Sequence, residues 1–146
     1  MATLENTLKS FINSLIKSKK SNSTILAYRK DLLQFYDYLA EKKLTEFNSI
    51  TPEIVDSYIN KLSTEGVFTL KTVSRKINSL RTFFKYVLRQ GFIKVDPTTA
   101  VKHPKIENKL PRVLETEEFL KLLNLTKDNA RLNTIVTVLL QTGLRI

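Results

Sequence analysis

Hydrophobic residues in the amino-terminal part of the chain recur at alternating steps of three and four, the spacing of one face of an α-helix. Four such stretches follow one another, and short polar segments separate them. The pattern predicts helices near 4–15, 24–39, 52–66 and 70–90. The apolar faces of these helices, in chain order, are Leu4, Leu8, Phe11 and Leu15; Ile25, Tyr28, Leu32, Phe35 and Leu39; Ile54 or Val55, Tyr58 and Leu62; and Val73, Ile77, Leu80, Phe84 and Val87.

Capping signals support these helix boundaries. Thr51-Pro52-Glu53 combines an N-cap hydroxyl, a proline at the first helical position and an acid at the positive end of the helix dipole. Gly91 is well placed as the left-handed residue after the fourth helix. Ser21, Asn22 or Ser23 can cap the second helix. With short connections and no convincing stretch of alternating polarity, the predicted fold is all-α, a four-helix bundle.

The hydrophobic pattern changes after the fourth helix. Residues 96–114 contain three of the four prolines, scattered charges and no sustained periodicity, which is typical of an extended linker. Two further amphipathic stretches follow, "ETEEFLKLL" and Leu132 to Gln141. Two helices cannot easily bury their apolar sides alone. We therefore expect a helical domain at 1–95, a linker at 96–114, and at 115–146 the start of a second domain whose remainder is missing.

Composition narrows the class of protein. The apolar content of 42% is close to the globular norm, so a packed core is feasible. The chain has no cysteine, which excludes disulfides and thiolate metal sites and is compatible with a reducing cytoplasm. The polar and apolar residues at the start do not form a signal peptide, and the most apolar run is far shorter than the ~20 residues of a membrane span. A cytoplasmic protein without a membrane partner is expected.

Positive charge is concentrated in the fourth helix. The chain has 24 Lys and Arg against 14 Asp and Glu, a net charge of +10, and the usual partner of such a surplus is a polyanion. No acidic residue occurs between Glu65 and Asp96. The cations in that interval are Lys71, Arg75, Lys76, Arg81, Lys85, Arg89 and Lys94. At 100° per residue, Lys71 lies about 200° from Val73, so the polar stripe is opposite the apolar one. This basic stripe is Lys71, Arg75, Asn78, Thr82, Lys85 and Arg89.

The basic stripe favours binding to nucleic acid over a plain solvated face. Solvated helices normally mix charges of both signs to gain pairs four residues apart, and here no carboxylate of the same helix offsets the like-charge neighbours. A helix of this diameter fits the major groove of B-DNA, where Arg and Lys reach guanine edges or phosphates. Thr24, Arg29 and Lys30 of the second helix are candidates to extend the surface, although Asp31 intrudes there.

Four segments together resemble the tyrosine recombinases of the phage-integrase family, in the style of the Xer-type chromosome and plasmid resolvases. They are "NSTILAYRKDLLQFYDYLAEKKL", "TVSRKINSLRTFFKYVLRQGFIKVDPTTAVKHPK", "KLPRVLETEEFLKLL" and "TGLRI". The resemblance implies an amino-terminal four-helix, SAM-like core-binding domain and a larger catalytic domain that close around double-stranded DNA, with other recombinase protomers as partners. It places Lys71, Thr72 and Arg75 as leading DNA contacts of the fourth helix, with Arg81 among the further candidates.

The resemblance also places Arg145 on the first catalytic arginine of the family motif. The family's later catalytic residues, including the nucleophilic tyrosine, have no counterpart here, so the chain looks cut off just after Arg145 and is not expected to exchange strands. Core packing is the expected role of its tyrosines, which are Tyr28, Tyr36, Tyr38, Tyr58 and Tyr86. His103 stands alone in the predicted linker and is interpreted as structural or solvent-facing. No metal, cofactor or small-molecule substrate is expected.

Three functions remain open on the sequence. The first is a site-specific DNA recombinase represented by its core-binding domain, linker and first catalytic-domain helices. The second is a DNA-binding module that occupies recombination sites without cleaving them. The third is a helical protein–protein adaptor that uses the Phe- and Leu-rich stripes. The sequence does not distinguish a chromosomal, plasmid or mobile-element role.

Overall fold

The computed structural model describes residues 4–64, 66–106 and 113–144. Its helices, in chain order, are α1 (Leu4–Lys17), α2 (Asn22–Glu41), the 3-10 turn η1 (Phe47–Ser49), α3 (Pro52–Thr64), α4 (Leu70–Arg89), α5 (Thr116–Thr126) and α6 (Ala130–Thr142). The described residues contain no β-strand. The all-α fold and all the predicted helices are therefore confirmed, and η1 is the element that the hydrophobic pattern did not indicate.

The helices begin and end at the residues that local chemistry favours. The Ser21 hydroxyl accepts from the Thr24 N–H at 3.3 Å and caps α2, so that helix starts two residues before the predicted position. α3 begins at Pro52, and Gly91 takes a left-handed conformation, with φ +75°, after α4. At the end of α6, Gly143 is left-handed at φ +64°.

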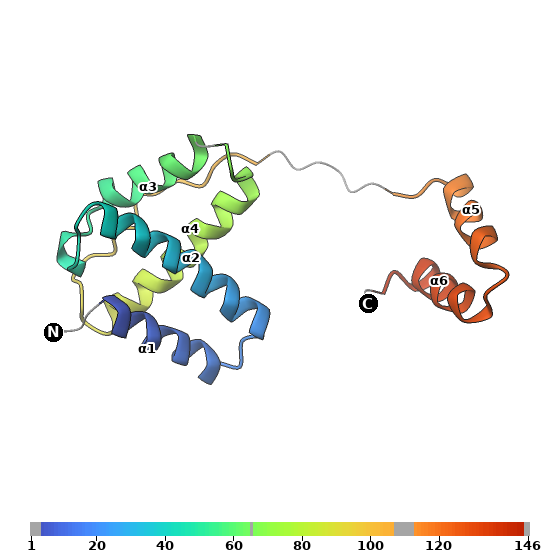
Figure 1. Ribbon diagram of the computed structural model, residues 1–146, viewed down its shortest axis with the longest axis horizontal. Helices are drawn as coiled ribbons and strands as arrows, with labels where there is room; N and C mark the ends of the chain where they lie inside the picture. The colour runs from blue at the N-terminus through green and yellow to red at the C-terminus, as the bar shows by residue number, and fades with distance from the viewer. Residues whose placement is uncertain (1–3, 65, 107–112, 145–146) are drawn as a thin grey trace. The chain divides into compact units, whose positions relative to one another are not determined.

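The chain divides into two compact units, Met1–Ile106 and Glu107–Ile146. In the first, α4 packs against α1, α2 and α3, and α1 packs against α2 (Figure 1). The apolar face of α4 lies at the centre, and its predicted residues Val73, Ile77, Leu80, Phe84 and Val87 are all at most 1% exposed. Burial of these side chains, with the apolar residues of α1, α2 and α3 that pack on them, drives the folding of this unit.

Residues 96–106 do not form the extended linker that was expected, because they belong to the first unit. The Asp96 carboxylate accepts from the Thr98 N–H at 2.8 Å and from its hydroxyl at 2.6 Å, which folds the chain back. Thr98 and Val101 are then buried at 2% and 3% exposure. The helical domain thus extends about ten residues beyond the predicted boundary at 95.

The second unit pairs α5 with α6 and has little core. Only Thr126 of α5 is buried, and no residue of α6 is. Leu120, Leu132, Ile135 and Val138 are between 43% and 54% exposed. Two helices therefore leave much of their apolar surface in contact with water, as expected, although Leu123, Leu139 and Leu140 are half-buried.

Tyr58 provides a test of the bundle core. Its ring packs 5.0 Å from Phe35, but its buried hydroxyl has no hydrogen-bond partner among the described residues. Burial, with the charges of Asp31 and Asp37, raises the pKa of this hydroxyl far above its usual value, so it stays neutral. We expect Tyr58→Phe to leave the free energy of unfolding unchanged or raise it by up to about 1 kcal/mol, because nothing is lost with the hydroxyl. Urea denaturation followed by circular dichroism measures this.

Tyr36→Phe is the matched control for that substitution. The Tyr36 hydroxyl donates to the Leu4 carbonyl oxygen at 2.9 Å, so its removal should lower the free energy of unfolding by about 0.5–1.5 kcal/mol. A loss of more than about 1 kcal/mol in Tyr58→Phe would show that the Tyr58 hydroxyl does find a partner in solution.

Candidate nucleic-acid interface

The outer face of α4 carries the basic stripe. Lys71, Arg75, Asn78, Lys85 and Arg89 are exposed and Thr82 is half-buried, whereas the opposite face of the helix is fully buried. The Thr69 hydroxyl caps the helix by accepting from the Thr72 N–H at 3.3 Å. The exposed face of this 20-residue helix carries a line of cations and hydrogen-bond donors that runs from Lys71 to Arg89.

A carboxylate from α2 meets the basic stripe, contrary to the expectation that its charges stand unopposed. Asp31 does not intrude on the surface, because its side chain is only 1% exposed and turns inward to α4. Its Oδ2 accepts from Arg75 Nη1 and from the Ser79 hydroxyl, the latter at 2.7 Å. Arg75 itself remains 47% exposed at the surface. Buried carboxylates are stable in proteins when paired and hydrogen-bonded in this way.

Lys76 is not part of the surface charge. It is 2% exposed, and its Nζ lies 3.0 Å from Asp31 Oδ1, donates to Gln34 Oε1 and stands 4.9 Å from the centre of the Phe68 ring. One of the seven cations counted between Glu65 and Asp96 is thus internal. The sequence pattern could not separate Lys76 from its exposed neighbours, because the partners lie on another helix.

The start of α2 has the same local chemistry as the start of α4. Thr24 and Thr72 each occupy the third helical position, and each hydroxyl lies within 3.0 Å of the capping hydroxyl. Neither helix has an acidic residue in its first turn, unlike α1, α3 and α5. Arg29 and Lys30 are exposed on α2. The positive ends of both helix dipoles are therefore free of a competing carboxylate of their own first turn.

Arg81 and His103 hold the segment after the bundle against α4 through contacts that the sequence pattern did not indicate. Arg81 Nη2 donates to the Val101 carbonyl oxygen at 2.6 Å, and its Nη1 lies 2.8 Å from His103 Nε2. Since arginine only donates, His103 Nε2 accepts, and Nδ1–H donates to the Ser74 hydroxyl at 2.9 Å. Arg81 is thus engaged inside the unit, and His103 has a structural role, which is one of the two roles expected for it.

From this arrangement we expect the packing of residues 98–104 against α4 to depend on pH. Partial burial of the ring, together with the Arg81 charge, lowers the pKa of His103 below the ordinary value of about 6.5. The unfolded or undocked form therefore binds the proton more readily. The contribution of His103 to stability is complete above about pH 6.5 and is lost as the pH falls through its lowered pKa.

Hydrogen–deuterium exchange of peptides covering 98–104 measures this effect. We expect their protection, corrected for the intrinsic exchange rate, to be lower at about pH 5 than at about pH 7.5. His103→Gln should remove the pH dependence, since an amide does not titrate. Equal protection at both pH values in the unmodified chain would contradict the assigned role.

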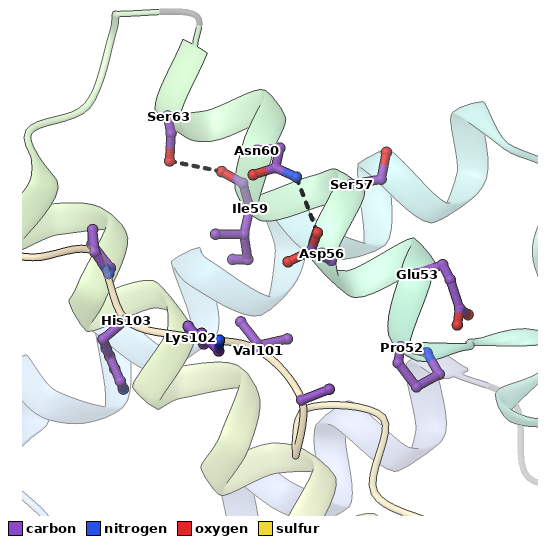
Figure 2. Close-up of a pocket in the computed structure, with 12 residues that line it drawn as sticks. Pro52, Glu53, Asp56, Ser57, Ile59, Asn60, Ser63, Val101, Lys102 and His103 are labelled. Atoms are coloured by element: carbon purple, nitrogen blue, oxygen red, sulfur yellow. Dashed lines mark hydrogen bonds between the residues drawn. The ribbon is translucent and has the colours of Figure 1, made fainter.

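A groove of about 730 Å³ lies between α3 and residues 100–104 (Figure 2). Glu53 and Asp56 line its α3 side, with Lys102 and His103 across from them. The Thr51 hydroxyl bonds the Glu53 carboxylate and lowers its pKa below the ordinary value, which further favours the ionised form that a glutamate already has near neutral pH. Two carboxylates make the α3 side of the groove unfavourable for a phosphate backbone, in contrast to the basic stripe of α4.

The remaining candidate residues divide between the core and the undescribed positions. The tyrosines pack with other rings of the first unit; Tyr28 and Tyr86 lie 5.8 and 5.4 Å from Phe11, and Tyr38 lies 5.1 Å from Tyr58. Arg145 lies outside the described residues.

In the described part of the chain, no three potential metal-ligating acids or histidines gather at one place. No helix described here has the length and apolarity needed to cross a bilayer.

Comparison with known proteins gives a consistent result. Residues 8–91 match the family described as phage integrase, N-terminal SAM-like domain. The chain is 35% identical over 144 residues to the tyrosine recombinase XerD of Staphylococcus epidermidis, covering 95% of this chain and 48% of that protein. It is 33% identical over 151 residues to the tyrosine recombinase XerC of Leptospira interrogans, covering 99% and 48%. The chain thus spans about half the length of these curated relatives.

Solved structures agree on the fold. A lambda integrase dimer bound to a COC′ core site matches 98% of this chain and 39% of that one, with a TM-score of 0.76 at 19% identity. The XerA recombinase matches 97% and 47%, with a TM-score of 0.54 at 23% identity. At these identities the likeness establishes the fold alone. With a helical domain that matches the family over more than half of the sequence, the chain belongs to the phage integrase family of tyrosine recombinases and is Xer-like.

Proposed function

We propose that this chain binds double-stranded DNA through the basic stripe of α4, with Thr24, Arg29 and Lys30 of α2 extending the surface. The observation that carries the proposal is the division of α4 into a fully buried apolar face and an exposed face bearing Lys71, Arg75, Lys85 and Arg89. Thr72 and Asn78 add hydrogen-bond donors and acceptors between these cations. Four exposed cations on one face of a helix can contact the phosphates that border a groove of DNA.

We further propose that the complete protein is a site-specific recombinase of the cytoplasm, acting with other protomers of its kind. In such an enzyme a tyrosine hydroxyl attacks a DNA phosphodiester, forms a phosphotyrosyl bond and frees a 5′ hydroxyl. Negative charge builds on the non-bridging oxygens in the transition state, and a guanidinium fork stabilises it. Arg145, after the turn at Gly143, is proposed for that role. Residues from about 115 onward are proposed to begin the catalytic domain.

A non-cleaving role is the second candidate for the 146-residue chain as it stands. All five of its tyrosines belong to the first unit, where they are buried or half-buried among other rings, and core packing is their proposed role. We therefore propose that this chain occupies DNA without forming a covalent adduct. Denaturing gel electrophoresis after incubation with labelled duplex tests the point, since a phosphotyrosyl bond would survive denaturation.

The salt dependence of DNA binding tests the interface. If Lys71, Arg75, Lys85 and Arg89 each contact a phosphate, the logarithm of the association constant should fall against the logarithm of salt concentration with a slope of about −3 to −4. Fluorescence anisotropy with a labelled mixed-sequence duplex measures the slope. Salt-independent binding, or no binding at low salt, would contradict the DNA interface and favour the protein–protein adaptor.

Arg75→Ala is expected to weaken binding by about 1–3 kcal/mol if the guanidinium reads a base edge, and to reduce the salt slope by about one unit if it contacts a phosphate. Lys9→Ala is the matched control, because Lys9 is an exposed cation on α1 outside the basic stripe. Its removal changes the net charge by the same amount and should alter affinity far less. Equal effects of the two substitutions would show that net charge alone, without the α4 face, drives binding.

A further inference from the structure

The buried carboxylate of Asp31 joins α2 to three residues of α4, Arg75, Lys76 and Ser79, which lie within little more than one helical turn. Its Oδ1 lies 3.0 Å from Lys76 Nζ, and its Oδ2 accepts from both Ser79 and Arg75. The Asp31 and Lys76 side chains are 1% and 3% exposed, whereas Arg75 is 47% exposed. Asp31 and Lys76 are therefore buried, and Arg75 is the charged residue of the cluster that reaches solvent.

The charges of this cluster do not cancel. One carboxylate faces two cations, so a net charge of +1 remains. Lys76 is the partner that shares the buried site with Asp31 and is enough to neutralise it. Arg75 is bonded to Asp31 through Nη1 alone among the described residues, and a guanidinium carries five N–H groups. Arg75 thus keeps both charge and donors for an anion outside the protein.

We propose that Asp31 is a positioning residue for DNA binding, which holds the Arg75 guanidinium in its DNA-facing conformation before DNA arrives. The inference rests on the proposed DNA interface of α4. A free arginine side chain loses rotamer freedom when it is fixed against a phosphate or base, and this loss weakens binding. A bond to a buried, immobile carboxylate removes most of that freedom in advance. The Ser79 hydroxyl also donates to Asp31 Oδ2 and so fixes the direction of the bond between Asp31 and Arg75.

Whether Asp31→Asn raises or lowers the affinity for DNA distinguishes a positioning role of Asp31 from simple neutralisation of charge. If Asp31 only neutralised part of the basic stripe, removing its charge would strengthen binding to a polyanion. If Asp31 positions Arg75, Asp31→Asn should weaken binding to a labelled mixed-sequence duplex by about threefold to tenfold despite the gain in net charge. Asp37→Asn is the charge-matched control, because Asp37 is an exposed acid of the same helix. Its removal should leave affinity unchanged or slightly higher.

A double-mutant cycle assigns the effect to Arg75. In an Arg75→Ala background, Asp31→Asn should no longer weaken binding, because the side chain to be positioned is gone. Lys76→Met disturbs the same buried cluster but leaves the bond from Asp31 to Arg75 in place, and it should keep affinity within about twofold. An equal loss of affinity in Lys76→Met, or an undiminished loss in the double variant, would overturn the proposal.

Ser79→Ala covers the case in which Asp31→Asn does not fold. It keeps the ion pairs and removes one bond to Asp31 Oδ2, and it should weaken binding in the same direction by a smaller factor. No loss of affinity in a folded Ser79→Ala or Asp31→Asn chain, alongside a loss in Arg75→Ala, would refute the positioning role alone. No loss in Arg75→Ala, Lys71→Ala or Lys85→Ala would instead refute the proposed DNA interface.

Discussion

Replacement of Phe83 by alanine is expected to lower the free energy of unfolding of the first unit by about 3–5 kcal/mol. Phe83 is 0% exposed on α4, and its ring contacts one ring from each of three other elements. The ring centroids lie 5.4 Å from Phe11 of α1, 6.1 Å from Tyr36 of α2 and 6.3 Å from Phe47 of η1. Removal of this ring leaves a cavity that no single helix can fill, because its lining belongs to four elements.

Such a loss is large against the 5–15 kcal/mol that is typical of a domain, so Phe83→Ala should be partly unfolded at moderate temperature. Urea denaturation followed by tyrosine fluorescence is the sharpest measurement, since the chain has no tryptophan and all five tyrosines lie in the first unit. Leu88→Ala on the same helix is the control; Leu88 is 37% exposed, and its loss should cost below about 1 kcal/mol. A cost below about 1.5 kcal/mol for Phe83→Ala would contradict the central position of its ring.

The second large effect is expected in amide hydrogen exchange. Amides of α4 should exchange at least about a thousandfold more slowly than those of α5 and α6 in the same 146-residue chain. α4 is covered by three helices and has eight buried residues, whereas α6 has none and α5 has one. Opening α4 requires unfolding the whole first unit, while α5 and α6 can separate with little loss of buried apolar area.

Hydrogen–deuterium exchange with mass spectrometry resolves the three helices as separate peptides. Peptides of α3 provide an internal reference, because α3 also packs on α4 and should be protected to a similar degree. Protection in α5 and α6 equal to that in α4 would show that the second unit has a stable core of its own. It would also make residues 115–146 an independent folding unit rather than the proposed start of a larger domain.

The helices and most of the core could be predicted because their signals are local. The alternating spacing of Leu8, Phe11 and Leu15, or of Val73, Ile77 and Leu80, is read within a single helix, and burial follows from which face is apolar. The exposed position of the basic stripe follows from the same geometry, since it lies opposite the apolar face of α4. The caps at Ser21 and Pro52 and the turn at Gly91 depend on neighbouring residues only.

The polar contacts could not be predicted because their partners are distant in the chain. Asp31 was expected on the surface beside Arg29 and Lys30, and it turns inward because Arg75, Lys76 and Ser79 meet it from another helix. Likewise, nothing near His103 in the sequence indicates Ser74 and Arg81, 29 and 22 residues away. The fold of residues 96–101, which a proline-rich pattern assigned to a linker, depends on a site for Val101 in the bundle.

The amino-acid sequence by itself determined the number and place of the main helices, the buried face of each, and the line of cations on the outside of α4, because these properties depend on the period of a single helix. The tertiary structure decided which cations of α4 are used inside the protein and how those at its surface are held. It buries Lys76, engages Arg81 and ties Arg75 to Asp31, because a charge that leaves water must meet an opposite charge or donor, and only packing brings that partner from elsewhere in the chain.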